Sequence, residues 1–195
     1  MTVSIHQAHE LLLKLEQAGL SPEDAQAVIE SGGNALAEVV VSTVRGFGEE
    51  FYYPFKTSAL TLKELWELNQ DLLGQDCWWR NEPFANVKGT VGKLLLRSSA
   101  VLGSFGKNWG EQQTLLSSGD FVPGVRDVIE GMIAYYRDTG MRLFPNYWVR
   151  TIDVSSCSDR VCVWFSPGRL LISGCWDEDR LPNVGLAVVR KAPEL

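Results

Sequence analysis

The chain has 195 residues, of which 45% are hydrophobic and 22% charged, proportions typical of a globular protein that can bury a core. A net charge of -6 without any cluster of Lys or Arg argues against direct binding of nucleic acid. No apolar run reaches the length of about 18 residues that a membrane-spanning helix needs, so we expect no membrane contact.

Residues 1–46 predict a small helical region. Ser4 and Gln7 match a capping box ahead of the first helix, and Ser21 and Pro22 are typical of the start of a second. A valine-rich run at 35–44 is compatible with a helix or a strand. The first helix carries charged residues and lacks a small-residue cleavage site, so we expect no signal peptide and a cytoplasmic location.

Residues 47–195 predict a domain of the α+β class. Thr61 is expected to cap a helix that runs to Leu73, and Lys93–Arg97 predicts a strand. The clearest helix is Pro123–Thr139, which has one apolar face and ends at Gly140 in a left-handed cap. Alternating patterns then predict the strands Tyr147–Asp153, Arg160–Phe165, Arg169–Ser173 and Val184–Arg190. We expect the Pro123–Thr139 helix to pack on a sheet that contains the first and last of these strands.

The residues that most often bind metals or act as nucleophiles form no convincing set. His6 and His9 share a helix face, and the choice is between a metal pair and an ordinary surface helix, which we favour because no third ligand is evident. The four cysteines contain no CxxC pair, so reduced thiols are expected. Cys157 and Cys162 are either a reactive pair or inert thiols, and the absence of a nearby basic cluster favours inert thiols.

Catalytic motifs are also missing from the sequence. Asp177–Asp179 is an acidic triplet that matches no EF-hand loop, and a solvated loop or a pairing with Arg180 is the simpler interpretation. The sequence has no GxSxG, P-loop or GxGxxG motif. We therefore expect no catalytic residues, no metal site and no cofactor, and we expect that the protein is not an enzyme.

The last third of the chain mixes two kinds of residue. Segments such as 155–158 and 181–183 look chemically arbitrary, whereas Phe165, Trp176 and Gly185 have clear structural uses. This contrast is compatible with ordinary loops or with a variable binding surface held on a fixed frame. The residues that stand out as frame are Val149–Thr151, Arg160, Val161, Phe165, Gly168, Leu170, Trp176, Asp177, Arg180 and Gly185–Lys191.

This set resembles the C-terminal region of the variable proteins of diversity-generating retroelements. Those proteins have a C-type-lectin-like fold that is related to the fold of formylglycine-generating enzymes. In them a reverse transcriptase miscopies adenines of a template RNA, so that codons of the asparagine type change while Trp and Glu lie out of reach. The resemblance implies that Trp164, Trp176 and Glu178 are frame. It implies variable, ligand-binding positions at Cys157, Cys162, Arg169, Leu171, Ser173, Gly174, Cys175, Asp179, Leu181 and Asn183.

Two features depart from related families. The Glu-Pro-Asn pattern of calcium-dependent lectins is absent, since Asn81–Pro83 reverses it, and the reactive cysteine pair of formylglycine-generating enzymes has no clear match. The hypothesis is a C-type-lectin-like domain with an N-terminal helical region, whose segment 150–191 is diversified and binds a macromolecule, expected to be a protein. The alternatives are a formylglycine-generating-type or other lectin-fold enzyme, and a structural interaction protein of fixed sequence.

Overall fold

The computed structural model describes residues 52–73, 78–166 and 168–192. The chain divides into two compact units, 1–49 and 50–195, and all described residues belong to the second. The helices expected within residues 1–46, and with them His6 and His9, lie outside the described residues. No helix of the described part is long and apolar enough to cross a membrane.

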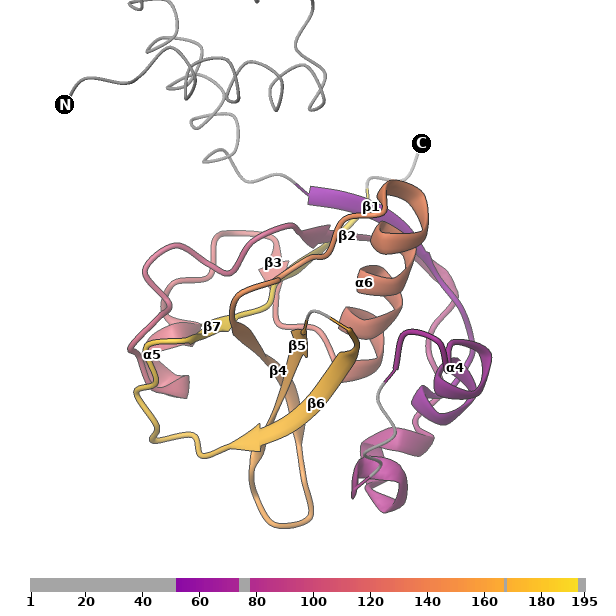
Figure 1. The fold of residues 1–195 in the computed structure, drawn as a ribbon. Helices are drawn as coiled ribbons and strands as arrows, with labels where there is room; N and C mark the ends of the chain where they lie inside the picture. Colours follow the sequence, from indigo (N-terminus) through magenta and orange to yellow (C-terminus); the bar gives the residue numbers. More distant parts are fainter. Residues whose placement is uncertain (1–51, 74–77, 167, 193–195) are drawn as a thin grey trace, which may run out of the picture. The chain divides into compact units, whose positions relative to one another are not determined.

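One antiparallel sheet gathers strands from both ends of the unit (Figure 1). It is formed by β1 (Tyr52–Thr57), β2 (Gly92–Arg97), β8 (Val189–Lys191) and β3 (Asp120–Phe121), which lie side by side in that order. The strand expected at Lys93–Arg97 is thus confirmed as β2.

The second sheet is formed by the C-terminal meander (Figure 1). Its strands lie in the order β6 (Leu170–Cys175), β5 (Arg160–Phe165), β4 (Trp148–Val154) and β7 (Val184–Leu186). β4, β5 and β6 are antiparallel neighbours, whereas β7 lies parallel to β4. The three predicted strands that precede β7 are therefore confirmed, β5 with unchanged bounds and β4 and β6 shifted by one or two residues.

The last predicted strand is divided between the two sheets. Val184–Leu186 pairs with β4 as expected, but Val189–Lys191 pairs with β2 and β3 in the first sheet, so a single strand Val184–Arg190 is wrong. The chain crosses at Ala187, whose N–H donates to the carbonyl of Arg150, and at Val188, whose carbonyl accepts from Arg97. Residues 184–189 are all buried, so their unbroken apolar run gave no sign of the crossing.

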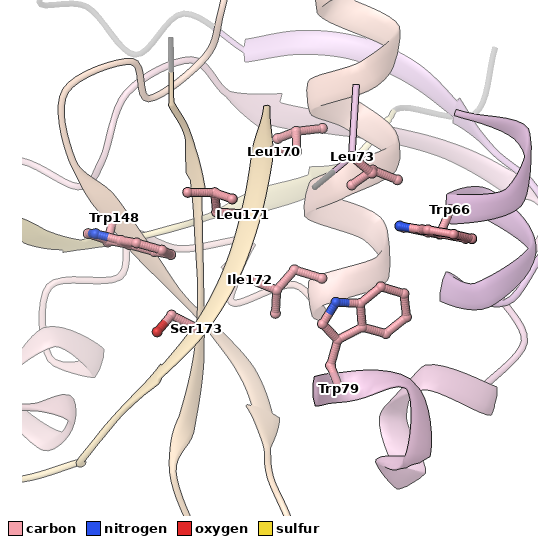
Figure 2. A pocket seen from close by; sticks show the side chains of 8 residues that line it. All are labelled: Trp66, Leu73, Trp79, Trp148, Leu170, Leu171, Ile172 and Ser173. Atoms are coloured by element: carbon pink, nitrogen blue, oxygen red, sulfur yellow. The ribbon is translucent and has the colours of Figure 1, made fainter. Parts of the chain in front are cut away.

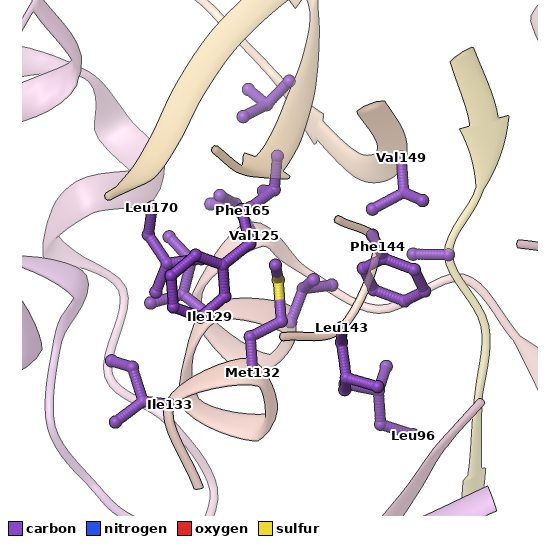
Figure 3. Close-up of a cluster of buried hydrophobic side chains, with 14 of the residues drawn as sticks. Leu96, Val125, Ile129, Met132, Ile133, Leu143, Phe144, Val149, Phe165 and Leu170 are labelled. Atoms are coloured by element: carbon purple, nitrogen blue, oxygen red, sulfur yellow. The ribbon is translucent and has the colours of Figure 1, made fainter. Parts of the chain in front are cut away.

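The helix α6 (Val125–Thr139) packs against strands of both sheets and forms the centre of the core. Ile129 and Met132 are fully buried, and Gly140 ends the helix at φ 71°, the left-handed cap that the sequence predicted. Figure 3 shows Ile129 and Met132 near Phe144 and near Phe165 and Leu170 of the second sheet. The helix thus covers one face of the second sheet, while the opposite face carries partly exposed side chains on β4, β5 and β6.

Shorter elements surround this core. They are α4 (Leu62–Leu68), α5 (Trp109–Gln113) and the 3-10 helices η1 (Trp78–Asn81) and η2 (Pro83–Asn86). Thr61 caps α4 in a capping box as expected, but the helix ends at Leu68 and not at Leu73. The reason is that Leu72 and Leu73 pair with the edge strand β6, where the N–H of Leu170 donates to the carbonyl of Leu72 at 2.7 Å.

Candidate ligand-binding face

The second sheet turns one side toward α6 and the other side away from it. Because side chains alternate along a strand, Leu171 and Ser173 of β6 share the side that faces away from α6. Trp164 of β5 lies opposite Leu171, and Trp148 of β4 follows it on the same side. We call these partly exposed residues, Trp148, Trp164, Leu171 and Ser173, the outer face.

Two tryptophans dominate the outer face. The rings of Trp148 and Trp164 lie with centroids 5.4 Å apart at an angle of 52°, so each restricts the other. The indole N–H of Trp164 donates to the carbonyl of Pro145 at 3.1 Å. The indole N–H of Trp148 has no hydrogen-bond acceptor among the described residues and is not buried, so it is available to a ligand.

A pocket of about 150 Å³ adjoins the outer face at the edge strand β6. Figure 2 shows Trp148 and Leu171 at one side of this strand and Trp66, Trp79 and Ile172 at the other. An apolar cavity of roughly this volume holds a group the size of one aromatic ring. The pocket therefore suits a single apolar side chain of a ligand that lies on the outer face.

The segment 176–183, which joins β6 to β7, flanks the outer face. Its main chain is held on both sides, since Trp109 N–H donates to the carbonyl of Asp177 at 2.8 Å and Gly106 N–H to that of Leu181 at 3.0 Å. Its side chains point largely to solvent, with Trp176 68% exposed. The segment thus presents exposed side chains on a fixed backbone.

Arg150 anchors this segment from the same side of the second sheet as the outer face, two residues after Trp148 on β4. It is fully buried on β4, although a guanidinium group carries a positive charge at physiological pH. No carboxylate of the described residues forms an ion pair with it. Its N–H groups instead donate to the carbonyls of Lys107 (2.9 Å), Trp176 (3.2 Å) and Asp179 (2.8 Å), to Gln112 Oε1 (3.0 Å) and to Cys175 Sγ (3.3 Å).

Cys175 and Cys162 form a buried pair of thiols on the same side of the second sheet as the outer face and next to it, with their Sγ atoms 2.7 Å apart. The hydrogen bond with Cys162 and the hydrogen bond and charge of Arg150 lower the pKa of the Cys175 thiol to about 7, although burial acts in the opposite direction. The same hydrogen bond, together with burial, raises the pKa of Cys162 well above its ordinary value. Cys175 is therefore the more acidic thiol of the pair and the one that ionises first as the pH rises.

The structure separates the predicted variable positions into two groups. Variable positions of a binding surface should be exposed, but the side chains of Cys162 and Cys175 are buried and pack against Trp148. Whether any of the other positions binds a ligand stays a prediction. Cys157, Arg169, Gly174, Leu181 and Asn183 are exposed, and Leu171, Ser173 and Asp179 are partly exposed.

Two of the predicted frame residues, Trp164 and Trp176, have side chains that are at least partly exposed. Trp176 is 68% exposed, while its main chain is fixed by hydrogen bonds. Trp164 is partly exposed on the outer face, while its neighbour Phe165 is buried. Trp148 and Gln112 were not predicted from the sequence as residues of the site. The alternation of the β4 strand gave a signal for Trp148, but nothing in the sequence indicated that Gln112 contacts Arg150.

Gly174 is exposed but is not free to vary. A Cβ atom at this position would lie 2.8 Å from the Cβ of Asp159 on the neighbouring turn. We expect Gly174→Asn to lower the free energy of unfolding by about 1–3 kcal/mol, because the strand must shift to relieve this overlap. Chemical denaturation measures the change, and Asn183→Gly, at an exposed position, is the control. Equal stability of the Gly174→Asn variant and the wild type would contradict the tight approach.

One residue of the acidic triplet and the arginine that follows it form ion pairs with other parts of the domain. Asp177 pairs with Arg160 at 2.8 Å, and Arg180, the partner suggested by the sequence, pairs with Glu111 of α5 instead. Within the described residues, no group of three or more His, Cys, Asp or Glu side chains is placed to hold a metal ion. Asp177 and Arg180 thus tie the segment 176–183 to β5 and α5 through ion pairs.

A second, larger cleft lies at the start of α6 and is lined by Arg126, Asp127 and Asp153. Its charged groups are engaged within the protein, since Arg126 pairs with Asp127 and Glu130, and Asp153 accepts a hydrogen bond of 2.6 Å from the N–H of Val125. Burial is the main reason why the pKa values of Asp127 and Asp153 are raised. Through these contacts the carboxylates hold the first turn of α6.

Asp153 makes stability depend on pH. Its pKa in the folded chain lies above its ordinary 3.8, so the stabilisation from its bound proton is present below that pH and is lost as the pH rises through the raised pKa. We expect Asp153→Asn, which keeps an oxygen acceptor for Val125, to show a smaller loss of stability as the pH rises from about 4 to about 6. Urea denaturation across this range measures it. Parallel curves for the two proteins would contradict the assignment.

No protein-family model, curated protein or solved structure matches this chain.

Proposed function

We propose that this chain is a ligand-binding protein whose binding surface consists of the outer face and the segment 176–183. The observation that carries the proposal is the exposure of Trp148, Trp164 and Trp176 around one side of the second sheet. Tryptophan supplies a large apolar area and one polar N–H group, which makes it the residue most enriched among the anchors of protein interfaces. A surface with several accessible indoles is the feature of this unit that best suits a macromolecular ligand, expected to be a protein.

The surroundings of these tryptophans favour binding without large rearrangement. The outer face is carried by hydrogen-bonded strands, and Arg150 and its acceptors hold the adjoining segment. Side chains that are already ordered lose less conformational entropy on association than those of a mobile loop. The pocket at β6 adds a place where one side chain of the ligand can insert.

The proposal includes diversification of the segment 150–191 by a retroelement and, with it, a C-type-lectin-like form of the α+β fold. The resemblance described above supports this, and so does the accessibility of most positions that it marks as variable. The structure narrows the proposed set, because changes at a buried thiol or at Gly174 disturb the frame. The proposed variable positions are Cys157, Arg169, Leu171, Ser173, Asp179, Leu181 and Asn183.

The DNA that adjoins the gene tests diversification. We expect a second copy of the segment that encodes residues 150–191, near a reverse transcriptase gene, with mismatches at adenines of that copy. The mismatches should fall in the codons of the proposed variable positions and spare those of Cys162, Cys175 and Trp148. Absence of such a copy would support the alternative of a fixed interaction surface, and mismatches in core codons would refute the proposed set.

A surface that accepts diversity must contribute little to folding. We expect simultaneous replacement of Arg169, Leu171, Ser173 and Leu181 by alanine to lower the free energy of unfolding by less than about 2 kcal/mol in total. Trp176→Ala should lower it by less than about 1 kcal/mol, because the indole is exposed. The control is Leu186→Ala, a fully buried side chain, for which we expect a loss of about 2–5 kcal/mol. A multiple variant less stable than Leu186→Ala would show that these positions belong to the frame.

A further inference from the structure

The buried thiol pair has the geometry of a site that forms a disulfide. Cys162 lies opposite Ser173, and Cys175 lies opposite Arg160, so the two cysteines are diagonal neighbours on adjacent antiparallel strands. Their Sγ atoms are 2.7 Å apart, and a covalent S–S bond has a length of about 2.05 Å. A small movement of two side chains therefore suffices to join them, with no change in strand pairing.

The surroundings make Cys175 the nucleophile. Thiolates react and thiols do not, and a neighbouring cation stabilises the thiolate. Arg150 donates from Nε to the Cys175 sulfur at 3.3 Å, and no carboxylate of the described residues pairs with this guanidinium group. The Cys175 thiolate is thus the only negative charge among the five groups that accept hydrogen bonds from Arg150, the other four being neutral oxygens.

Access to the pair is narrow. Cys175 is 8% exposed and Cys162 is 2% exposed, and both belong to a buried cluster against which Trp148 packs. An oxidant must therefore be close to the size of water to reach the Cys175 sulfur, whereas a peptide disulfide is too large. We therefore expect a small peroxide to oxidise the pair faster than glutathione disulfide does.

We propose that Cys175 and Cys162 form a peroxide-reactive site, in which hydrogen peroxide converts the two thiols to a disulfide. The Cys175 thiolate attacks one peroxide oxygen, an S–O bond forms, the O–O bond breaks, and the leaving hydroxide takes up a proton to become water. Cys162 then attacks the sulfur of the Cys175 sulfenic acid, an S–S bond forms, the S–O bond breaks, and its own proton leaves with the hydroxide as a second water. Two electrons pass from the thiols to the peroxide.

Oxidation of the pair would change the surroundings of Arg150, which holds the segment 176–183. Disulfide formation removes the anion that faces Arg150, while the same guanidinium group still binds the carbonyls of Trp176 and Asp179. The site thus links the redox state of the pair to the backbone beside Trp176. It does not depend on the proposed ligand-binding function, because the reaction involves only buried groups.

The reaction is tested on the full chain, reduced, freed of reductant and treated with a slight excess of hydrogen peroxide. Free thiols are then blocked with N-ethylmaleimide, and the protein is digested and analysed by mass spectrometry. We expect one peptide pair joined through Cys162 and Cys175. Cys157→Ser, and Cys77→Ser at a position outside the described residues, should leave this product unchanged. In Cys162→Ser, Cys175 should stop at a sulfenic acid that dimedone traps, and Cys175→Ser should abolish the reaction at Cys162.

Two further measurements do not require variants. The rate of disulfide formation in the wild type should fall about tenfold from pH 8 to pH 6, following a thiolate with a pKa of about 7. Glutathione disulfide at the same concentration should react at least about tenfold more slowly than hydrogen peroxide, because the pair is buried. Full alkylation of both cysteines after peroxide treatment would overturn the proposal, and so would a disulfide that joins Cys157 or Cys77 instead.

Discussion

Replacement of Arg150 by methionine should destabilise the domain more than any change on its surface. Methionine approximates the length of the side chain but donates no hydrogen bond, so the Gln112 side chain and the Lys107 carbonyl lose a buried partner together with the carbonyls that hold the segment 176–183. A buried polar group without a partner costs about 1–3 kcal/mol, and breaking a buried charged contact typically costs about 3–5 kcal/mol. We expect a loss of about 3–5 kcal/mol in the free energy of unfolding.

One further variant separates the charge of Arg150 from its geometry, and a second serves as a control. Arg150→Lys keeps the charge but has three donors without the planar fork, so its stability should lie between those of the wild type and Arg150→Met. Arg169→Ala removes an exposed arginine and should change stability by no more than about 0.5 kcal/mol. Guanidinium chloride denaturation measures all of them. An Arg150→Met variant as stable as Arg169→Ala would show that the buried hydrogen bonds contribute nothing.

Local patterns in the sequence were sufficient to predict the elements around the candidate site. The apolar face of α6 and the glycine after it predicted a helix that ends at Gly140, and the run of residues Arg160–Phe165, rich in valine and aromatic residues, predicted β5 with its observed bounds. These features depend on neighbours within a few positions along the chain. The α+β class follows from the order of such elements and is confirmed, whereas the C-type-lectin-like form stays a proposal.

The orientation of side chains in the second sheet could not be predicted in the same way. β5 is apolar on both faces, because Cys162 and Trp164 face one side and Val161, Val163 and Phe165 face α6. Without polar residues in alternation, the sequence does not indicate which face is covered. Size was misleading as well, since Trp176 is exposed while the smaller Cys175 is buried.

The position of Arg150 shows a second limit. Charged residues are rarely buried without a partner, and the partners of Arg150 are carbonyls and an amide from residues 107, 112, 176 and 179. A main-chain carbonyl carries no residue-specific signal, so no pattern in the sequence indicates that these groups converge. The thiol pair was missed for a related reason, because Cys162 and Cys175 meet through strand register and lie 13 residues apart in the chain.

Two adjacent residues of β5 provide the sharpest test of which side of the second sheet is the frame. Phe165 is 1% exposed and packs against Tyr136 of α6 with ring centroids 5.2 Å apart. Trp164 points to the opposite side, where it is partly exposed and contacts Trp148. The larger side chain therefore has the smaller role in the core, which reverses the order that residue size alone predicts.

We expect Phe165→Ala to lower the free energy of unfolding by about 3–5 kcal/mol, because it leaves a cavity between β5 and α6. Trp164→Ala should cost only about 1–2 kcal/mol, the loss of one aromatic contact and of part of its buried area. Urea denaturation of both variants measures the difference. The affinity for a ligand of the outer face should change in the opposite order, because Trp164→Ala should weaken binding more than Phe165→Ala does. If Trp164→Ala proves the less stable variant, the outer face is a second core surface and does not bind a ligand.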